Sequence, residues 1–216
     1  INTLKSRTDA RISALDYDDM LAKYYDAVVG TKGYSAKIKT DAIAAAKDLI
    51  KDAVIAKENK DLTYAEIDEI IKANKDAAIA KVTDVKTTDE LKAQANELKT
   101  LFDSLPTTVT VADKETILSA QKAFDTYLEL PGTATTDVIN AYKLKNAMKS
   151  LMTEEAKAVN AQIKALPETI TINDADAIKA ARDAYKALEE TYGDYDNDST
   201  FNYLGATVQS LVSRAN

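Results

Sequence analysis

Cysteine, histidine and tryptophan are all absent from this chain of 216 residues. Their absence excludes disulfides, Cys/His zinc sites and every mechanism that needs an imidazole to move protons near neutral pH. The chain also has no P-loop, no HExxH helix and no nucleophile elbow. We therefore expect a protein that is not an enzyme and that binds no cofactor, apart from the calcium ion considered below.

Glycine and proline are scarce, with only five and three residues. Alanine, lysine and aspartate are abundant instead, and leucine and isoleucine are frequent, which is typical of a mostly helical chain. The hydrophobic share of 45% is enough to bury substantial cores. The longest apolar runs are only a few residues, whereas crossing a bilayer takes roughly 20. The composition thus predicts a soluble all-α protein with no membrane span.

The charge and the first residue bear on partners and location. The formal net charge is −7 and no basic cluster is present, so we expect no nucleic-acid partner. The chain begins at Ile1 without a charged-then-apolar leader, which predicts a processed or excised piece of a longer polypeptide. The lack of cysteine slightly favours an exported protein.

One pattern occurs twice, 61 residues apart. SLPTTVTVADKETILSAQKAF occupies 104–124, and ALPETITINDADAIKAARDAY occupies 165–185. Matching residues continue upstream and, with one residue removed, downstream. This similarity predicts that a unit of about 60 residues is duplicated. We expect a more divergent copy in the first half, where DAIAAAKDLIK at 41–51 aligns with DAIKAARDAYK at 176–186.

Each repeated segment begins with Leu-Pro. Because proline disfavours the α conformation in the residue before it, Leu105 and Leu166 are expected to end the incoming helices. The next residues, TTVTV and ETITI, alternate and are β-branched, so they predict short extended connectors with one apolar face in a helix groove. Asp113 and Asp174 are expected to cap the helices that follow. The residues of the apolar face are Val109, Val111, Ile170 and Ile172.

The longest predicted helix runs from 137 to 166, because neither glycine nor proline interrupts it. At 1.5 Å per residue it would be about 45 Å long, too long for one bundle of about 60 residues. We therefore expect two consecutive modules to share it. Its apolar residues recur every three or four positions: Ala141, Leu144, Met148, Met152, Ala156, Val159, Ile163 and Leu166.

Helix boundaries can also be predicted in the first half. A helix over about 3–28 is expected to bend near residues 16–19. Thr63 and Glu66 have the spacing of a capping box, and Thr88 is expected to cap the next helix after a short linker.

The string LPETITINDADAIKAARDAY resembles helical repeats of large exported proteins of Gram-positive bacteria, including S-layer and cell-wall-associated proteins. The likeness covers residues 92–216 well and 36–83 loosely. It implies a secreted, all-helical structural protein of the cell surface and transfers no catalytic residue. No anchoring motif of these proteins and no basic wall-binding cluster is visible in the chain.

A candidate calcium site lies in GDYDNDSTFN at 193–202. Asp194, Asp196 and Asp198 alternate as do positions 1, 3 and 5 of an EF-hand loop. Position 6 is a serine instead of glycine, and position 12 is Gly205, which has no carboxylate. Two interpretations stay open: a calcium site at these three aspartates, or a polar loop that joins two helices without a metal.

The tyrosines and carboxylate pairs suggest other candidates. Tyr17, Tyr24 and Tyr25, with a lysine nearby, form a candidate cluster for binding a wall polymer. Tyr142 and Tyr185 are expected on core stripes of their helices, and Tyr127 is expected near one.

Carboxylate pairs such as Glu154 and Glu155 are expected on helix surfaces, where solvent and lysines one turn away stabilise them.

These features together predict an all-α fold. It is an elongated array of three-helix-bundle modules that share a long helix and are joined by short extended LPxxVTV connectors. The predicted domains are a divergent N-terminal module at 1–86, a second repeat at 87–152 and a third at 153–216.

The predicted function is structural: a non-catalytic S-layer lattice component or cell-wall spacer, located outside the cell at the surface. Its expected partners are neighbouring copies of itself or other surface-layer subunits. The alternative is a binding module, on the same scaffold, for cell-wall polysaccharide or a host protein. A spacer should have a featureless acidic exterior, whereas a binder should expose a contiguous aromatic or basic patch.

Overall fold

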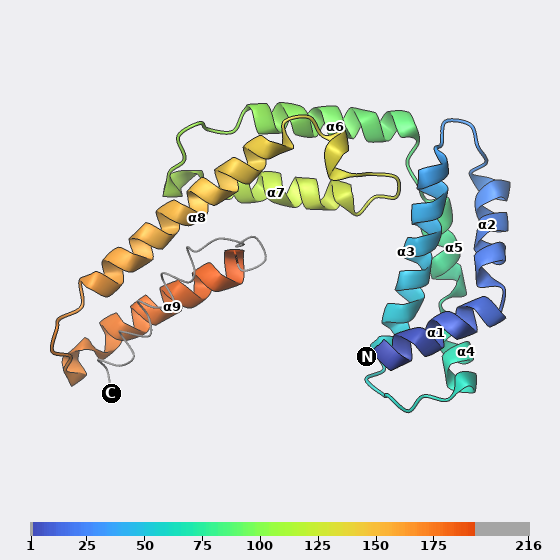
Figure 1. Ribbon diagram of the computed structural model, residues 1–216, viewed down its shortest axis with the longest axis horizontal. Helices are drawn as coiled ribbons and strands as arrows, with labels where there is room; N and C mark the ends of the chain where they lie inside the picture. Colours follow the sequence, from blue (N-terminus) through green and yellow to red (C-terminus); the bar gives the residue numbers. More distant parts are fainter. Residues whose placement is uncertain (1, 193–216) are drawn as a thin grey trace. The chain divides into compact units, whose positions relative to one another are not determined.

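The structure is a computed structural model that describes residues 2–192, with side chains from residue 3 (Figure 1). This part of the chain consists of helices, turns and loops, without a strand, so the predicted all-α class is confirmed. The α-helices are α1 (Asn2–Ala14), α2 (Tyr17–Val28), α3 (Ala36–Ile55), α4 (Tyr64–Ala73), α5 (Lys75–Thr83), α6 (Thr88–Asp103), α7 (Lys114–Leu128), α8 (Ala141–Lys164) and α9 (Ala175–Tyr192). Three short 3-10 helices are η1 (Val111–Asp113), η2 (Thr135–Asp137) and η3 (Ile172–Asp174).

The chain divides into two compact units. Unit 1 comprises residues 1–100 and 123–139, and unit 2 comprises 101–122 and 140–216. This division follows spatial contacts, whereas the three domains expected from the sequence follow repeats. The repeat boundaries after residues 86 and 152 therefore stay a prediction.

Unit 1 is a helical bundle built around α3, which contacts α1, α2, α4 and α5 (Figure 1). One face of α3 is completely buried because an apolar residue recurs at every fourth position. The two alanines of this face have small side chains, which let neighbouring helices approach closely. The residues of the face are Ile38, Ala42, Ala46, Ile50 and Val54.

The expected bend near residues 16–19 is confirmed, and it is a complete break between α1 and α2. Asp16 adopts a left-handed conformation with φ of +52°, which no α-helix can contain. Beyond the break, Tyr17 is buried and its hydroxyl lies 3.4 Å from the carbonyl oxygen of Ile71.

The capping box at the start of α4 is confirmed. The backbone N–H of Thr63 donates to Glu66 over 2.7 Å, and Thr63 Oγ1 accepts from the backbone N–H of Glu66 over 3.3 Å. The prediction of Thr88 as the cap of α6 is wrong by one residue. Thr87 makes the same two hydrogen bonds with Glu90, because the box needs its carboxylate three residues after the cap.

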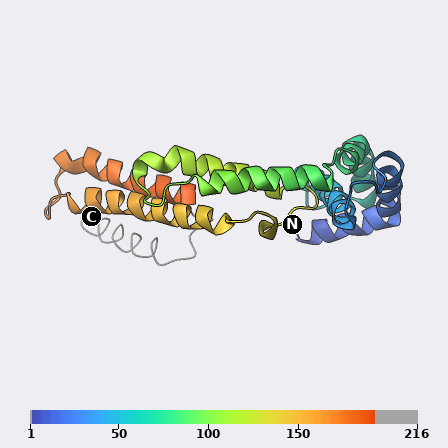
Figure 2. The same cartoon turned by 90° about the horizontal axis from the view of Figure 1, so that it is seen from above.

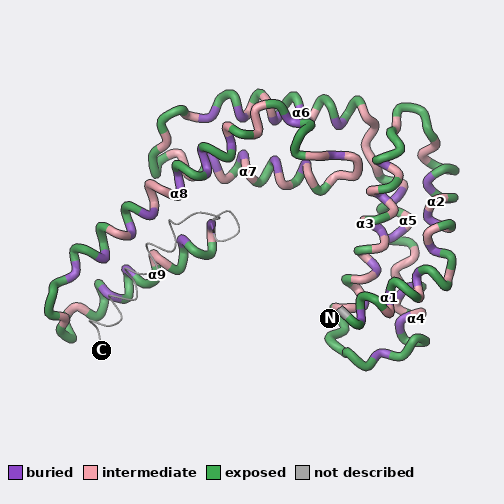
Figure 3. Tube along the Cα trace, viewed as in Figure 1, coloured by how far each residue is buried: buried purple, intermediate pink, exposed green. Residues whose placement is uncertain are grey.

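Unit 2 contains the long helix expected from the sequence. α8 is continuous for 24 residues and buries one apolar stripe, visible as the repeated purple bands in Figure 3. It lies beside α9 in both views (Figure 1 and Figure 2). Val159 and Ile163 pack there against Ile178 and Ala181.

The predicted start of this helix at residue 137 is wrong, since α8 begins at Ala141. Val138 is extended and Asn140 is left-handed, with φ of +69°, so the helix cannot extend further back. Asp103 at the end of α6 holds this start by accepting from Asn140 Nδ2 over 2.7 Å and from Lys143 Nζ over 2.6 Å.

The two Leu-Pro segments have the same local structure. α6 and α8 end two residues before Leu105 and Leu166, as expected, and each connector continues into a 3-10 turn that opens the next helix. Thr110 and Thr171 precede these turns with nearly identical backbone angles, φ −125° and −121°. The same sequence pattern therefore encodes the same helix-to-helix turn at both places.

Two details of the predicted connectors are wrong. The residues at the cap positions are Thr110 and Thr171, and Asp113 and Asp174 are instead their partners three residues on, because a carboxylate there reaches back to the threonine. The second apolar residue of each connector also points to solvent: Val111 is 48% exposed and Ile172 is 88% exposed. The 3-10 turn starts at these residues, so the strand-like alternation does not extend to them.

The loop after α7 is fixed against the start of α3 within unit 1. Gly132 N–H donates to Asp41 over 2.9 Å, and Lys37 Nζ donates to the carbonyl of Thr133 over 3.0 Å. Burial acts to raise the pKa of Asp41, but its hydrogen bonds with Lys37 and Gly132 lower it below the ordinary value. A Cβ on Gly132 would overlap with Cγ1 of Ile38, which is only 1% exposed and cannot move away.

Replacing Gly132 by alanine is therefore expected to destabilise unit 1. The positive φ of +92° and the overlap with Ile38 should together lower the free energy of unfolding by about 3 kcal/mol. Gly30→Ala is the matched control, since φ is +70° but nothing lies within 4 Å of the added Cβ. Gly30→Ala should lower the free energy of unfolding by only about 1 kcal/mol. Urea denaturation measures both values, and equal losses would contradict the close approach.

Candidate functional site

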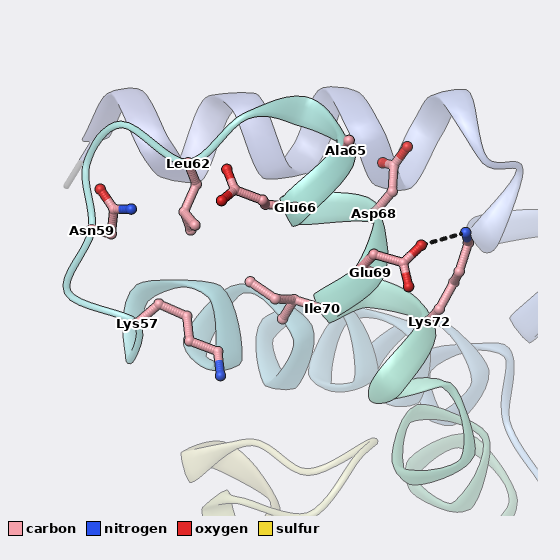
Figure 4. Close-up of a pocket in the computed structure, with 9 residues that line it drawn as sticks. All are labelled: Lys57, Asn59, Leu62, Ala65, Glu66, Asp68, Glu69, Ile70 and Lys72. Carbon is pink, nitrogen blue, oxygen red and sulfur yellow. Dashed lines mark hydrogen bonds and ion pairs between the residues drawn. The ribbon is translucent and has the colours of Figure 1, made fainter.

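A surface hollow of about 650 Å³ lies between α4 and the loop that joins α3 to it (Figure 4). Figure 4 shows three carboxylates of α4 around this hollow. Each already has a partner: Glu66 caps the helix at Thr63, Asp68 binds Arg11, and Glu69 pairs with Lys72 over 2.8 Å. The hollow thus offers no free acid and base that converge on one point, which acid–base catalysis would require.

The pair of Arg11 and Asp68 fastens α1 to α4. The guanidinium donates Nε and Nη2 to the two carboxylate oxygens, both over 2.8 Å, which is the strong bidentate geometry. The hydrogen bond with Arg11 lowers the pKa of Asp68. Arg11 and Arg7 also lie over the ring of Tyr64, at 5.6 and 5.2 Å from its centroid. This cluster stabilises the fold of unit 1.

A second cleft, of about 430 Å³, lies in unit 1 between α6, the start of α3 and the loop that follows α7. One face of α6 contributes Thr88, Lys92 and Asn96, which are spaced four residues apart, with Leu91 and an alanine beside them. Tyr127 of α7 also lines this cleft, and so does Asp137 at the far end of the loop. Burial, and after it the nearby Asp137 carboxylate, raises the pKa of Tyr127.

Unit 2 contains a polar cluster in which the start of α7 and the end of α9 lie beside the middle of α8. Lys114 at the start of α7 lies 2.7 Å from Glu155 of α8 and 6.0 Å from the ring centroid of Tyr192 at the end of α9. Burial, with the Glu155 carboxylate as the second cause, raises the pKa of Tyr192. The expectation that Glu155 is a solvated surface carboxylate is wrong, because its side chain is only 12% exposed. Glu154 behaves as expected and pairs with Lys157.

The other candidates have varied outcomes. Asp194, Asp196 and Asp198 lie outside the described residues, so the calcium prediction stays a prediction. Residues 2–192 contain no group of three His, Cys, Asp or Glu side chains arranged to hold a metal ion. Among the helices of this part of the chain, none is long and apolar enough to cross a membrane.

The tyrosine predictions are partly wrong. Tyr17 and Tyr25 are buried in the core of unit 1, so the proposed surface cluster with Tyr24 does not form there. Tyr142, expected on a core stripe, is 60% exposed, because it lies off the buried face of α8, which begins at Leu144. Tyr127 is buried and Tyr185 packs against the core of unit 2, both as expected.

The cleft on α6 was not predicted from the sequence. The spacing of Thr88, Lys92 and Asn96 marks one polar face of a helix, and this was the available signal. The facing wall comes from α3 and from the loop near Gly132, which are distant in sequence, so only the folded chain shows that they enclose a cleft.

The fold of the described residues defines an all-α protein of helical-bundle character. Comparison with known proteins adds no narrower class: no family model, no curated protein and no solved structure matches the chain.

The connector cap at η3 predicts a dependence of stability on pH. Hydrogen bonds from the backbone N–H and then the hydroxyl of Thr171 lower the pKa of Asp174. The stabilisation is complete above the ordinary aspartate pKa of about 3.9 and is lost as the pH falls through the lowered value. Asp174→Asn should therefore lower the Tm at pH 7, and this difference should shrink below about pH 4.

Thermal unfolding followed by circular dichroism from pH 7 to pH 2 measures this effect. Glu168→Gln is the control, because Glu168 belongs to the same connector and makes no hydrogen bond to another described residue. A Tm difference for Asp174→Asn that stays constant over this range, or equals that of the control, would refute the capping role of the charge.

Proposed function

We propose that this chain is a structural, non-catalytic segment of the surface layer of a Gram-positive bacterium, as a lattice component or a spacer. The observation that supports it is the turn encoded twice by the Leu-Pro segments, 61 residues apart, each of which ends one helix and opens the next. A structural array needs such a repeatable connection between helices, whereas an enzyme needs a site with converging reactive groups.

The proposed arrangement is a series of three-helix modules in an elongated array, in which α8 belongs to two successive modules. The buried residues of α8 favour this arrangement, since they extend from Leu144 near its start to Ile163 near its end. A helix with one continuous buried face can pack against different partners along its length. It would then transmit rigidity from one module to the next.

The location and partners belong to the same proposal. The resemblance of the Leu-Pro repeats to those of exported Gram-positive proteins supports a place outside the cell, at the wall or in the S-layer. The partners would be copies of this chain or other surface-layer subunits.

A second candidate is a binding module on the same scaffold, with cell-wall polysaccharide as its ligand. The cleft on α6 is the observation that favours it, because its walls combine an apolar floor with several polar side chains.

The array predicts an elongated particle in solution. A compact chain of 216 residues would have a radius of gyration of about 17 Å. Small-angle X-ray scattering of the purified chain should give a clearly larger value and a pair-distance function with a long tail. A radius near 17 Å with a symmetric function would refute the array.

The calcium interpretation has its own test. If Asp194, Asp196 and Asp198 bind Ca²⁺, adding millimolar CaCl₂ should raise the Tm of the native chain, since the ion would bind the folded form. Asp196→Asn should abolish this rise, and Asp89→Asn, an exposed aspartate on α6, should leave it unchanged. An unchanged Tm in the native chain would exclude a site that binds Ca²⁺ at millimolar concentrations.

A further inference from the structure

The cleft on α6 has walls that the fold holds in place before any ligand arrives. Gly132 packs directly on Ile38, and its N–H is fixed by Asp41. On the opposite wall, the backbone N–H of Thr88 donates to the carbonyl of Gly33 over 2.8 Å, which ties the start of α6 to the turn before α3. Little ordering is left for a ligand to induce, and that lowers the cost of binding.

The polar groups that α6 contributes to the cleft are available. Among the described residues, the side-chain amide of Asn96 and the hydroxyl of Thr88 have no hydrogen-bond partner. Lys92 has only a weak surface contact with Asp89, at 3.5 Å with both side chains largely exposed. An amide and a hydroxyl each donate and accept, so these groups suit a ligand that does both.

The charges of the cleft balance. Its lining has one ammonium, Lys92, and one carboxylate, Asp137. The helix starts beside it do not attract anions strongly, because they are already capped: Ser35 Oγ accepts from Ile38 N–H, and Thr87 Oγ1 accepts from Glu90 N–H. A cationic ligand would therefore be repelled by Lys92 and an anionic one by Asp137, and the cleft has no surplus of the opposite charge to outweigh that repulsion.

The floor of the cleft is apolar and its volume suits a small molecule. Ile38, Leu91 and Ala95 form this floor. At about 430 Å³ the cleft lies within the range of roughly 300 to 1,000 Å³ that small-molecule sites have. The ligand should thus have an apolar side as well as hydroxyl groups, and sugar rings combine these two properties.

We propose that this cleft binds a neutral saccharide of one or two rings, with Asn96 and Thr88 as the groups that hydrogen-bond its hydroxyls. Lys92 and Asp137 bind further hydroxyls as donor and acceptor, and the floor packs against the C–H face of a ring. This proposal rests on the second candidate function given above, a saccharide-binding module, and assigns its binding site to this cleft. It does not depend on the array, which the scattering experiment tests separately.

The test is a titration of the ¹⁵N-labelled full chain, followed by NMR, with glucose, N-acetylglucosamine, maltose and chitobiose. At least one of these sugars should cause saturable shifts at the backbone amides of Thr88 and Asn96 and at the Asn96 side-chain amide. Glucuronate and alanine are the charged and zwitterionic comparison ligands, and both should bind more weakly than the best neutral sugar.

Three variants make the test specific. Asn96→Ala should weaken binding roughly fivefold or more, the loss expected for one hydrogen bond. Thr88→Val, which keeps the shape, should weaken it similarly. Asn146→Ala is the matched control, because Asn146 is also an exposed helix asparagine but lies on α8, and it should leave binding unchanged. Far-UV circular dichroism confirms that each variant is folded.

Several results would overturn the proposal: no shift with any of the four sugars, shifts that persist at full affinity in both Asn96→Ala and Thr88→Val, or tighter binding of glucuronate or alanine. Maltotetraose distinguishes the two sources of a sugar. If maltotetraose binds as tightly as maltose or more tightly, the natural ligand is the end of a polysaccharide chain. If maltotetraose does not bind, the natural ligand is a free sugar. Both of these results support the cleft as the site.

Discussion

The start of a helix leaves backbone N–H groups without partners, and this chain meets that constraint repeatedly with one device. A threonine before the helix and a carboxylate three residues later bind each other, at Thr63 and Thr87 with glutamates and at Thr110 and Thr171 with aspartates. These boxes define where α4 and α6 begin and where the 3-10 turns before α7 and α9 begin, whereas α2 and α8 start after the left-handed residues Asp16 and Asn140.

The difference between glutamate and aspartate in these boxes matters for the local structure. The two boxes with glutamate open α4 and α6 directly, whereas the two with aspartate precede the 3-10 turns η1 and η3. An aspartate side chain is one methylene shorter, so it reaches its threonine when the first turn is tighter. The same 3-10 turns leave Val111 and Ile172 exposed to solvent. Connectors of this kind thus present an apolar side chain at a fixed place beside each new helix.

Unit 1 shows how a non-helical segment can build a surface feature on a helical scaffold. The loop around Gly132 approaches the start of α3 closely, because Gly132 has no Cβ and because Asp41 accepts a hydrogen bond from the N–H of Gly132. This contact forms one wall of the cleft on α6. Its opposite wall is a regular helix face, and the combination gives a hollow that an uninterrupted bundle would not have.

The sequence by itself determined the helical class, the ends of helices at the two Leu-Pro pairs, the break near Asp16 and the box at Thr63, because each depends on interactions between residues within a few positions. The long amphipathic helix was also predictable, since its apolar period repeats along the chain. Only the tertiary structure decided that Tyr17 and Tyr25 are core residues, that Glu155 is largely covered beside Lys114, and that α3, α6 and the Gly132 loop enclose a cleft. Those outcomes depend on which helix faces meet across long stretches of sequence, and local patterns contain no information on that pairing.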